Sequence, residues 1–226
     1  MFRSIRVIII LFCLTLISTT SVLAQDPATE VGVAVPGQNV IEIIGQIDQS
    51  LFSLTTYGYV THIEGIPDEE LFAEGTDPLM RDASNARFTV WGEGQSSGRA
   101  IHNNIFASTV NASLEIHYSE TPVGASFDTP ESFAGGTQIA VLSARLYSVL
   151  NVQEPNVGVL MVTSDSTQDV AEPFAIGDQS YTLGHVGLLH RFTLFGQGFR
   201  SSTEPLAAQY FFAGYAVIVG DSEMVE

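Results

Sequence analysis

The sequence contains no lysine, and basic residues are scarce throughout. Eight arginines stand against 25 aspartates and glutamates, which gives a formal net charge of −17. A charge of this sign repels phosphate backbones and anionic lipid head groups over about one Debye length. Because nucleic-acid binding needs a basic surface, we exclude nucleic acids and anionic membrane surfaces as partners.

Cysteine is nearly absent as well, and its one occurrence, Cys13, lies in a segment typical of an export signal. Arg3 and Arg6 precede an apolar run over residues 7–17, and small residues lead up to Ala24. We expect residues 1–24 to be a signal peptide cleaved after Ala24, which predicts a secreted or periplasmic protein. The alternative is an uncleaved anchor, although the run is shorter than the roughly 20 apolar residues that span a bilayer. After cleavage no cysteine remains, so no disulfide stabilises the domain.

Long runs with apolar residues at helical spacing are also missing. Instead, apolar residues mostly recur at every second position. Apolar Val110, Ala112, Leu114 and Ile116 alternate with polar neighbours, as in a half-buried strand. Similar patterns predict further strands, including 40–47, 51–63, 101–107, 157–163, 179–183, 186–195 and 209–219. We therefore predict an all-β fold, either a single antiparallel β-barrel or a two-sheet sandwich of about 9–10 strands.

The expected layout is a flexible lead-in over residues 25–38, one β domain over 39–220 and an acidic tail over 221–226. Ile139–Leu150 fits both a helical stripe and a strand, and we favour the strand because its neighbours are strands. Prolines 67 and 130 each predict a short helical turn, and Gly177-Asp178 predicts a tight hairpin. A membrane-embedded barrel is an alternative, but several strands are apolar on both faces, unlike those of a polar-lined pore.

Histidine and carboxylate residues supply the candidate catalytic group. Alternation places His190 on an apolar face and His62 beside Val60, with Glu64 two residues further on. If both rings point into a barrel, His62, Glu64 and His190 form a candidate general base or zinc site. The alternative is that both histidines are core residues bonded to backbone or tyrosine. No His-Glu-x-x-His or Gly-x-Ser-x-Gly motif is present.

A candidate ligand-binding set comes from arginines and aromatic residues on the polar faces of predicted strands. Arg87 or Arg191 would fix a carboxylate ligand, and Trp91, Tyr57 and Tyr59 would form stacking walls. The alternative is that these arginines are structural and paired with carboxylates.

We predict no cofactor, with a calcium ion at the acidic clusters as the alternative. Asp165, Asp169 and Glu172 are grouped in a predicted loop, and calcium accepts irregular sets of oxygen ligands. The spacing is not that of a dedicated calcium loop, so solvated surface acids are the alternative. The glycine groups at 92–98 and 196–198 lack a following helix, and we interpret them as bulges and hairpin loops.

These observations favour an exported β domain that binds a small or extracellular ligand. The alternatives are a cofactor-free or metal-assisted enzyme of isomerase or hydrolase type that uses His62, Glu64 and His190, and a structural surface or matrix protein. An enzyme requires the two histidines to converge beside a cavity. A binding protein requires a closed barrel with an apolar pocket of at least about 300 Å3.

Overall fold

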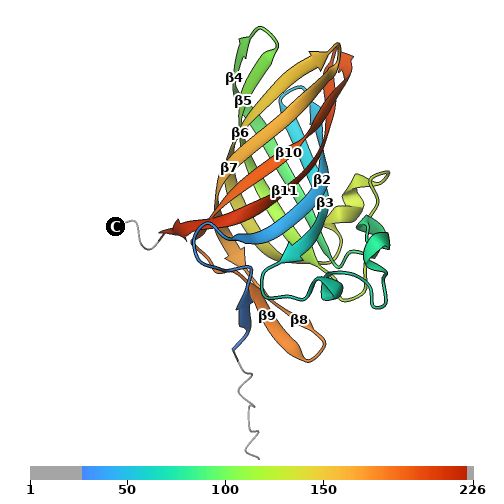
Figure 1. The fold of residues 1–226 in the computed structure, drawn as a ribbon, viewed down its shortest axis with the longest axis vertical. Coiled ribbons are helices and arrows are strands. Elements are labelled where there is room, and N and C mark those ends of the chain that lie inside the picture. Colours follow the sequence, from blue (N-terminus) through green and yellow to red (C-terminus); the bar gives the residue numbers. More distant parts are fainter. Residues whose placement is uncertain (1–26, 223–226) are drawn as a thin grey trace, which may run out of the picture.

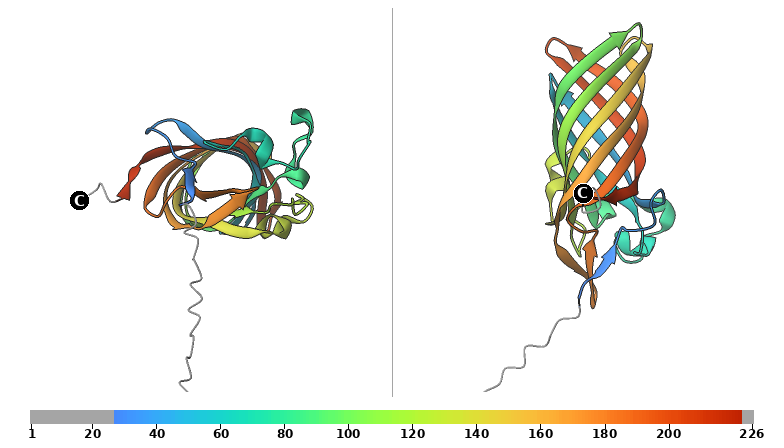
Figure 2. Two further views of the ribbon diagram at one scale, coloured as in Figure 1. Left: turned by 90° about the horizontal axis from the view of Figure 1, so that it is seen from below. Right: turned by 90° about the vertical axis from the view of Figure 1, so that its left-hand side faces the viewer.

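The computed structural model describes residues 27–222, and eight of its strands form a closed antiparallel barrel in the order β10-β11-β2-β3-β4-β5-β6-β7 (Figure 1). Viewed along its length the barrel is a ring (Figure 2). Its strands are β2 (Asn39–Ser50), β3 (Ser53–Ile63), β4 (Phe88–His102), β5 (Ile105–Tyr118), β6 (Thr137–Glu154), β7 (Val157–Ala171), β10 (Leu188–Thr203) and β11 (Leu206–Asp221). The predicted all-β fold is confirmed, with a barrel rather than a sandwich. The predicted signal peptide and residues 223–226 of the tail lie outside the described residues.

A small second sheet lies at one end of the barrel. It consists of β1 (Thr29–Val31), β9 (Gln179–Leu183) and β8 (Pro173–Ile176), with β1 parallel to β9. The hairpin predicted at Gly177 joins β8 to β9, and its glycine has a φ of +57°. Residues 29–31 were expected within a flexible lead-in; they form a strand because Val31 is buried against the barrel core.

Four short 3-10 turns lie in the loops at the same end. They are η1 (Asp68–Leu71), η2 (Pro78–Met80), η3 (Ala83–Asn85) and η4 (Pro130–Ala134). The turns predicted after Pro67 and at Pro130 are confirmed as η1 and η4. Over residues 27–222, none of the helical segments has the length and apolar character needed to cross a membrane. We call this the closed end of the barrel. The opposite end, where four hairpins turn, is the open end.

Strands are longer than predicted at several places. Ile139–Leu150 lies within β6, which confirms the strand interpretation, and β7 continues through the segment expected to be an acidic loop. The glycines expected in hairpin loops lie inside β4 and β10. Gly198 shows why glycine is tolerated there, since a Cβ at this position would lie 2.6 Å from the ring of Tyr210. In β4 the predicted bulge is present, between Ser96 and Gly98.

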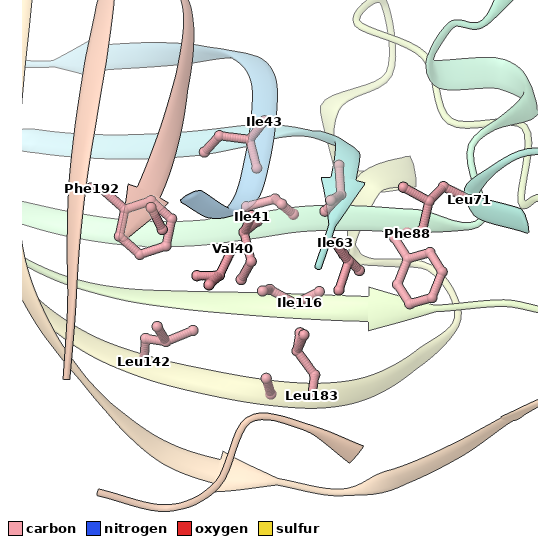
Figure 3. Close-up of a cluster of buried hydrophobic side chains, with 14 of the residues drawn as sticks. Val40, Ile41, Ile43, Ile63, Leu71, Phe88, Ile116, Leu142, Leu183 and Phe192 are labelled. Carbon is pink, nitrogen blue, oxygen red and sulfur yellow. The ribbon is translucent and has the colours of Figure 1, made fainter. Parts of the chain in front are cut away.

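The closed half of the barrel is filled by large apolar side chains from the inner faces of the strands (Figure 3). Phe174, Ile176 and Leu183 of the small sheet join this core and seal the end. The rings of Phe88 and Tyr118 have centroids 4.8 Å apart, and that of Phe174 lies 5.1 Å from Tyr118. Burial of apolar surface is the dominant favourable term in folding, and packed aromatic pairs add to it.

Candidate functional site: an apolar cavity at the open end

The open half of the barrel contains a cavity of about 390 Å3. An eight-stranded barrel is wide enough either to be filled by its own side chains or to hold one small ligand. Here the inner positions near the open end carry small residues, which leave the space unfilled. These small residues are Gly94, Ser96, Ser108, Ala112, Ser148 and Gly158, and the apolar part of the lining comes from Ile47, Leu54, Val110, Leu146, Leu150, Leu160 and Val162.

Polar groups gather near the mouth of this cavity. The Tyr210 hydroxyl donates to Oε1 of Gln49 at 2.7 Å. Arg200 donates from Nε and Nη2 to Oδ1 of Asn156, at 3.0 and 2.8 Å. The guanidinium of Arg99 lies over the ring of Phe106, 5.3 Å from its centroid. All six of these residues line the cavity together with the apolar residues given above, so the cavity has an apolar floor and a polar, cationic mouth.

A β-bulge turns Arg99 toward the cavity. In β4, Ser96 pairs with Val110 but Gly98 pairs with Thr109, so Ser97 is an extra residue that reverses the alternation of faces. Arg99 therefore lies opposite Ser108, which also lines the cavity. Burial raises the pKa of the Tyr210 hydroxyl, and the nearby positive charge of Arg99 acts in the opposite direction. Arg99 and Tyr210 both line the cavity.

The three predicted catalytic residues do not come together. His62 is near Glu64, with its Nε2 3.8 Å from the Glu64 carboxylate, and its Nδ1 lies 2.9 Å from Asp68. A bulge at Thr61 places His62 opposite Glu42 rather than in line with Val60. The expectation that His62 shares the inner face with Val60 is therefore wrong. Its side chain is on the outside of the wall and 30% exposed.

His190 is on the inner face, as predicted, and it is only 2% exposed. It lies opposite Ser166, whose hydroxyl is 3.2 Å from that of Ser164. Its Nδ1 has no hydrogen-bond partner within the described chain. Burial lowers the pKa of His190 to about 4, and the positive charge of nearby His185 acts in the same direction. The ring is therefore neutral at neutral pH, inside the barrel and separated by the wall from His62.

The predicted aromatic walls come together, but on the outside of the barrel. Tyr57 stacks on Trp91 with centroids 6.3 Å apart, and Phe133 of η4 covers it at 5.5 Å. The Tyr57 hydroxyl donates to Asp48 at 2.8 Å, and burial together with this bond raises its pKa. Tyr59 contacts Phe72 edge-on at 6.3 Å, and burial also raises its pKa. These side chains attach the closed-end loops to the barrel wall.

The two predicted ligand-binding arginines lie apart from these rings and from each other. Arg191 is on the outer face of β10, where its Nε and Nη2 donate to Asp165 at 2.9 and 2.8 Å. This is the structural ion pair that we gave as the alternative. Arg87 lines a more open depression of about 450 Å3 at the closed end, together with Glu69, Glu70 and Glu74.

The acids considered for calcium are distributed along a strand and not around a loop. Asp165 and Asp169 are both exposed on β7, and four residue steps of strand place their backbones about 13 Å apart. Asp165 is occupied by Arg191, and Asp169 accepts a hydrogen bond from the hydroxyl of Ser143. Glu172 follows β7, and its backbone N–H donates to Ile139. Among residues 27–222, no group of three or more histidine, cysteine, aspartate or glutamate side chains is placed to hold a metal ion.

Sequence reasoning missed Arg99, Arg200 and Tyr210 as members of one site. The predicted strands ended at the glycine groups, so both arginines were left in loops. The available signal was the alternation itself, since it continues through Gly196 and Gly198 to Arg200, which lies opposite inward-facing Ala208. Comparisons of the chain with protein-family models, curated proteins and solved structures found no match. The fold and the cavity define an eight-stranded antiparallel barrel that is packed at one end and hollow at the other.

Proposed function

We propose that this protein is an exported binding protein that holds a small, largely apolar molecule inside the open half of its barrel. The observation that carries the proposal is the cavity of about 390 Å3, within the size range of small-molecule sites. Its lining combines apolar side chains on the walls with a few polar groups at the mouth, which is the usual composition of such a site. Burial of an apolar ligand would release about 25 cal/mol for each Å2 removed from water.

The other two functions receive less support. An enzyme built on His62, Glu64 and His190 needs these groups around one substrate, and the barrel wall separates the histidines. A purely structural protein needs no hollow, because filling the interior would increase stability by the free energy of the added packing. The unfilled half of the barrel therefore favours binding.

The proposal is tested by filling the cavity. Ala112 is on the inner face of β5 and lines the cavity, whereas its neighbour Asn111 is exposed on the outer face of the same strand. We expect the wild-type protein to bind the uncharged fluorophore N-phenyl-1-naphthylamine. Ala112→Phe should weaken this binding at least about tenfold because the ring occupies the space, a change of about 1.4 kcal/mol.

The matched control is Asn111→Phe, which adds the same ring to the other side of the wall and should leave binding unchanged. Ser148→Phe on β6 is a second filling variant, and circular dichroism checks that each variant is folded. Failure of the wild-type protein to bind the fluorophore, or equal binding by the filled and control variants, would overturn the proposal.

A further inference from the structure

We infer that the ligand is an anionic amphipathic molecule, with its apolar part in the cavity and its carboxylate or similar acidic group held at the mouth by Arg99 and Arg200. This inference rests on the proposed function, and it adds the chemical class of the ligand. It comes from the placement of positive charge in a chain that has very little of it.

Cationic side chains are few, and their distribution is uneven. Of the eight arginines, Arg3 and Arg6 lie outside the described residues, which leaves six. Two of these six, Arg99 and Arg200, line the one cavity of the open end. On the outer wall, Arg191 forms an ion pair with Asp165.

The two arginines at the mouth have no such carboxylate. Within residues 27–222, Arg191 is the one arginine with a carboxylate oxygen within 4.0 Å of its guanidinium. Glu154 and Glu204 are on hairpins of the open end, yet neither forms an ion pair with Arg99 or Arg200 in the described structure. The positive charge at the mouth is therefore not neutralised by the chain itself, and it is available to an anionic ligand.

Both guanidinium groups are held in place by neutral partners. Arg200 uses two of its five N–H donors on the amide oxygen of Asn156, and its backbone N–H donates to the Asn156 carbonyl at 2.9 Å. The other three N–H donors of Arg200 remain for a ligand, and they lie in the plane of the guanidinium, a geometry that matches a carboxylate. Arg99 lies over Phe106, which fixes the group at the rim without reducing its charge. A site that is ordered before the ligand arrives loses less entropy on binding.

Other ligand classes fit this mouth less well. A cationic amphipath would meet two uncompensated positive charges. A neutral alcohol would find its hydrogen bonds at Tyr210 and Gln49 but would gain nothing from the guanidinium groups. Only an acidic head group uses every feature of the mouth, and its charge-assisted hydrogen bonds are roughly twice as strong as neutral ones.

The test compares three probes that share one apolar chain and differ only in the head group: decanoate, decanol and decylamine. Isothermal titration calorimetry at about pH 8 keeps the carboxylate ionised. We expect decanoate to bind at least about tenfold more tightly than decanol, and decylamine to bind more weakly than decanol. In the R99Q/R200Q variant, the affinity for decanoate should fall to that for decanol, while the affinity for decanol stays unchanged.

The matched control is R145Q/R191Q, which removes the same charge from the outer wall, where Arg145 and Arg191 are exposed. It should keep the preference for decanoate. Equal binding of decanol and decanoate by the wild-type protein, or loss of the preference in the control variant as well, would overturn the inference and leave the proposed function intact. If none of the three probes binds, the proposed function fails with it.

Discussion

At the scale of single residues, His190 is a buried polar group without full hydrogen bonding. It is on the inner wall beside two serines, and its Nδ1 has no partner in the described chain. A buried polar atom without a hydrogen bond destabilises a fold by about 1–3 kcal/mol. Charging the ring would cost more, so the folded protein keeps His190 neutral well below the pH at which an exposed histidine is protonated.

The consequence for stability follows from the pKa of His190, which burial lowers from 6.5 to about 4. As the pH falls below 6.5, His190 binds a proton in the unfolded chain but not in the folded barrel. The folded state therefore loses stability down to about pH 4. Because of this difference in proton binding, the free energy of unfolding should be about 2 kcal/mol lower at pH 5 than at pH 7.5. We expect His190→Leu to remove this part of the acid sensitivity.

Urea unfolding of both proteins at these two pH values measures the difference. His102→Leu, at the exposed end of β4, serves as the control, because it also removes one histidine but not the buried one. The same loss of stability on acidification in wild type and His190→Leu would show that the ring is protonated in the folded protein.

At the scale of elements, the three-residue strand β1 depends on contacts from distant segments. Val31 is buried in the core, and the N–H of Gly32 donates to the Glu64 carbonyl at 2.7 Å. His185, between β9 and β10, reaches Glu30 of β1 at 2.5 Å and Asp221 of β11 at 2.6 Å. One imidazole thus joins both ends of the described chain to the small sheet.

These contacts give His185 a pH dependence of the opposite sign to that of His190. Hydrogen bonds to Glu30 and then to Asp221 raise the pKa of His185 above 6.5. Its stabilising effect is therefore full below pH 6.5 and is lost as the pH rises through the raised pKa. We expect His185→Gln to lower the melting temperature more at pH 6 than at pH 9, by an amount in keeping with exposed ion pairs of up to about 1 kcal/mol each.

Differential scanning fluorimetry at low and high salt checks this prediction, since the ring is 44% exposed and salt should weaken its ion pairs. A melting temperature that falls equally at both pH values would mean that His185 acts through packing and not through charge.

Elements also show how far prediction from sequence extends. The period of two identified most of the barrel strands, because alternation between core and solvent is a local property of a half-buried strand. It failed at the bulge of Thr61, which moved His62 to the outer face. It also failed at the glycines of β4 and β10, where close approach of neighbouring groups, and not a turn, requires glycine. Both depend on a partner strand that the local sequence does not reveal.

At the scale of the whole molecule, the proposed export of the protein makes a direct prediction. Cleavage after Ala24 should leave a mature chain that begins at Gln25. N-terminal sequencing of the exported protein tests this, and Ala24→Asp should block cleavage because the position before the scissile bond requires a small residue. Recovery of the intact 226-residue chain from the cell membrane would instead support the uncleaved anchor.

The sequence by itself determined the all-β class, because this follows from local alternation, and its single cysteine leaves no intramolecular disulfide to form. Only the tertiary structure decided that the sheet closes into a barrel, that one half is packed while the other is hollow, and that Arg99 and Arg200 line the same cavity. Closure depends on how the eight strands pair, and the cavity volume depends on the summed size of their inner side chains. That sum exists only after residues far apart in the chain have been brought into register.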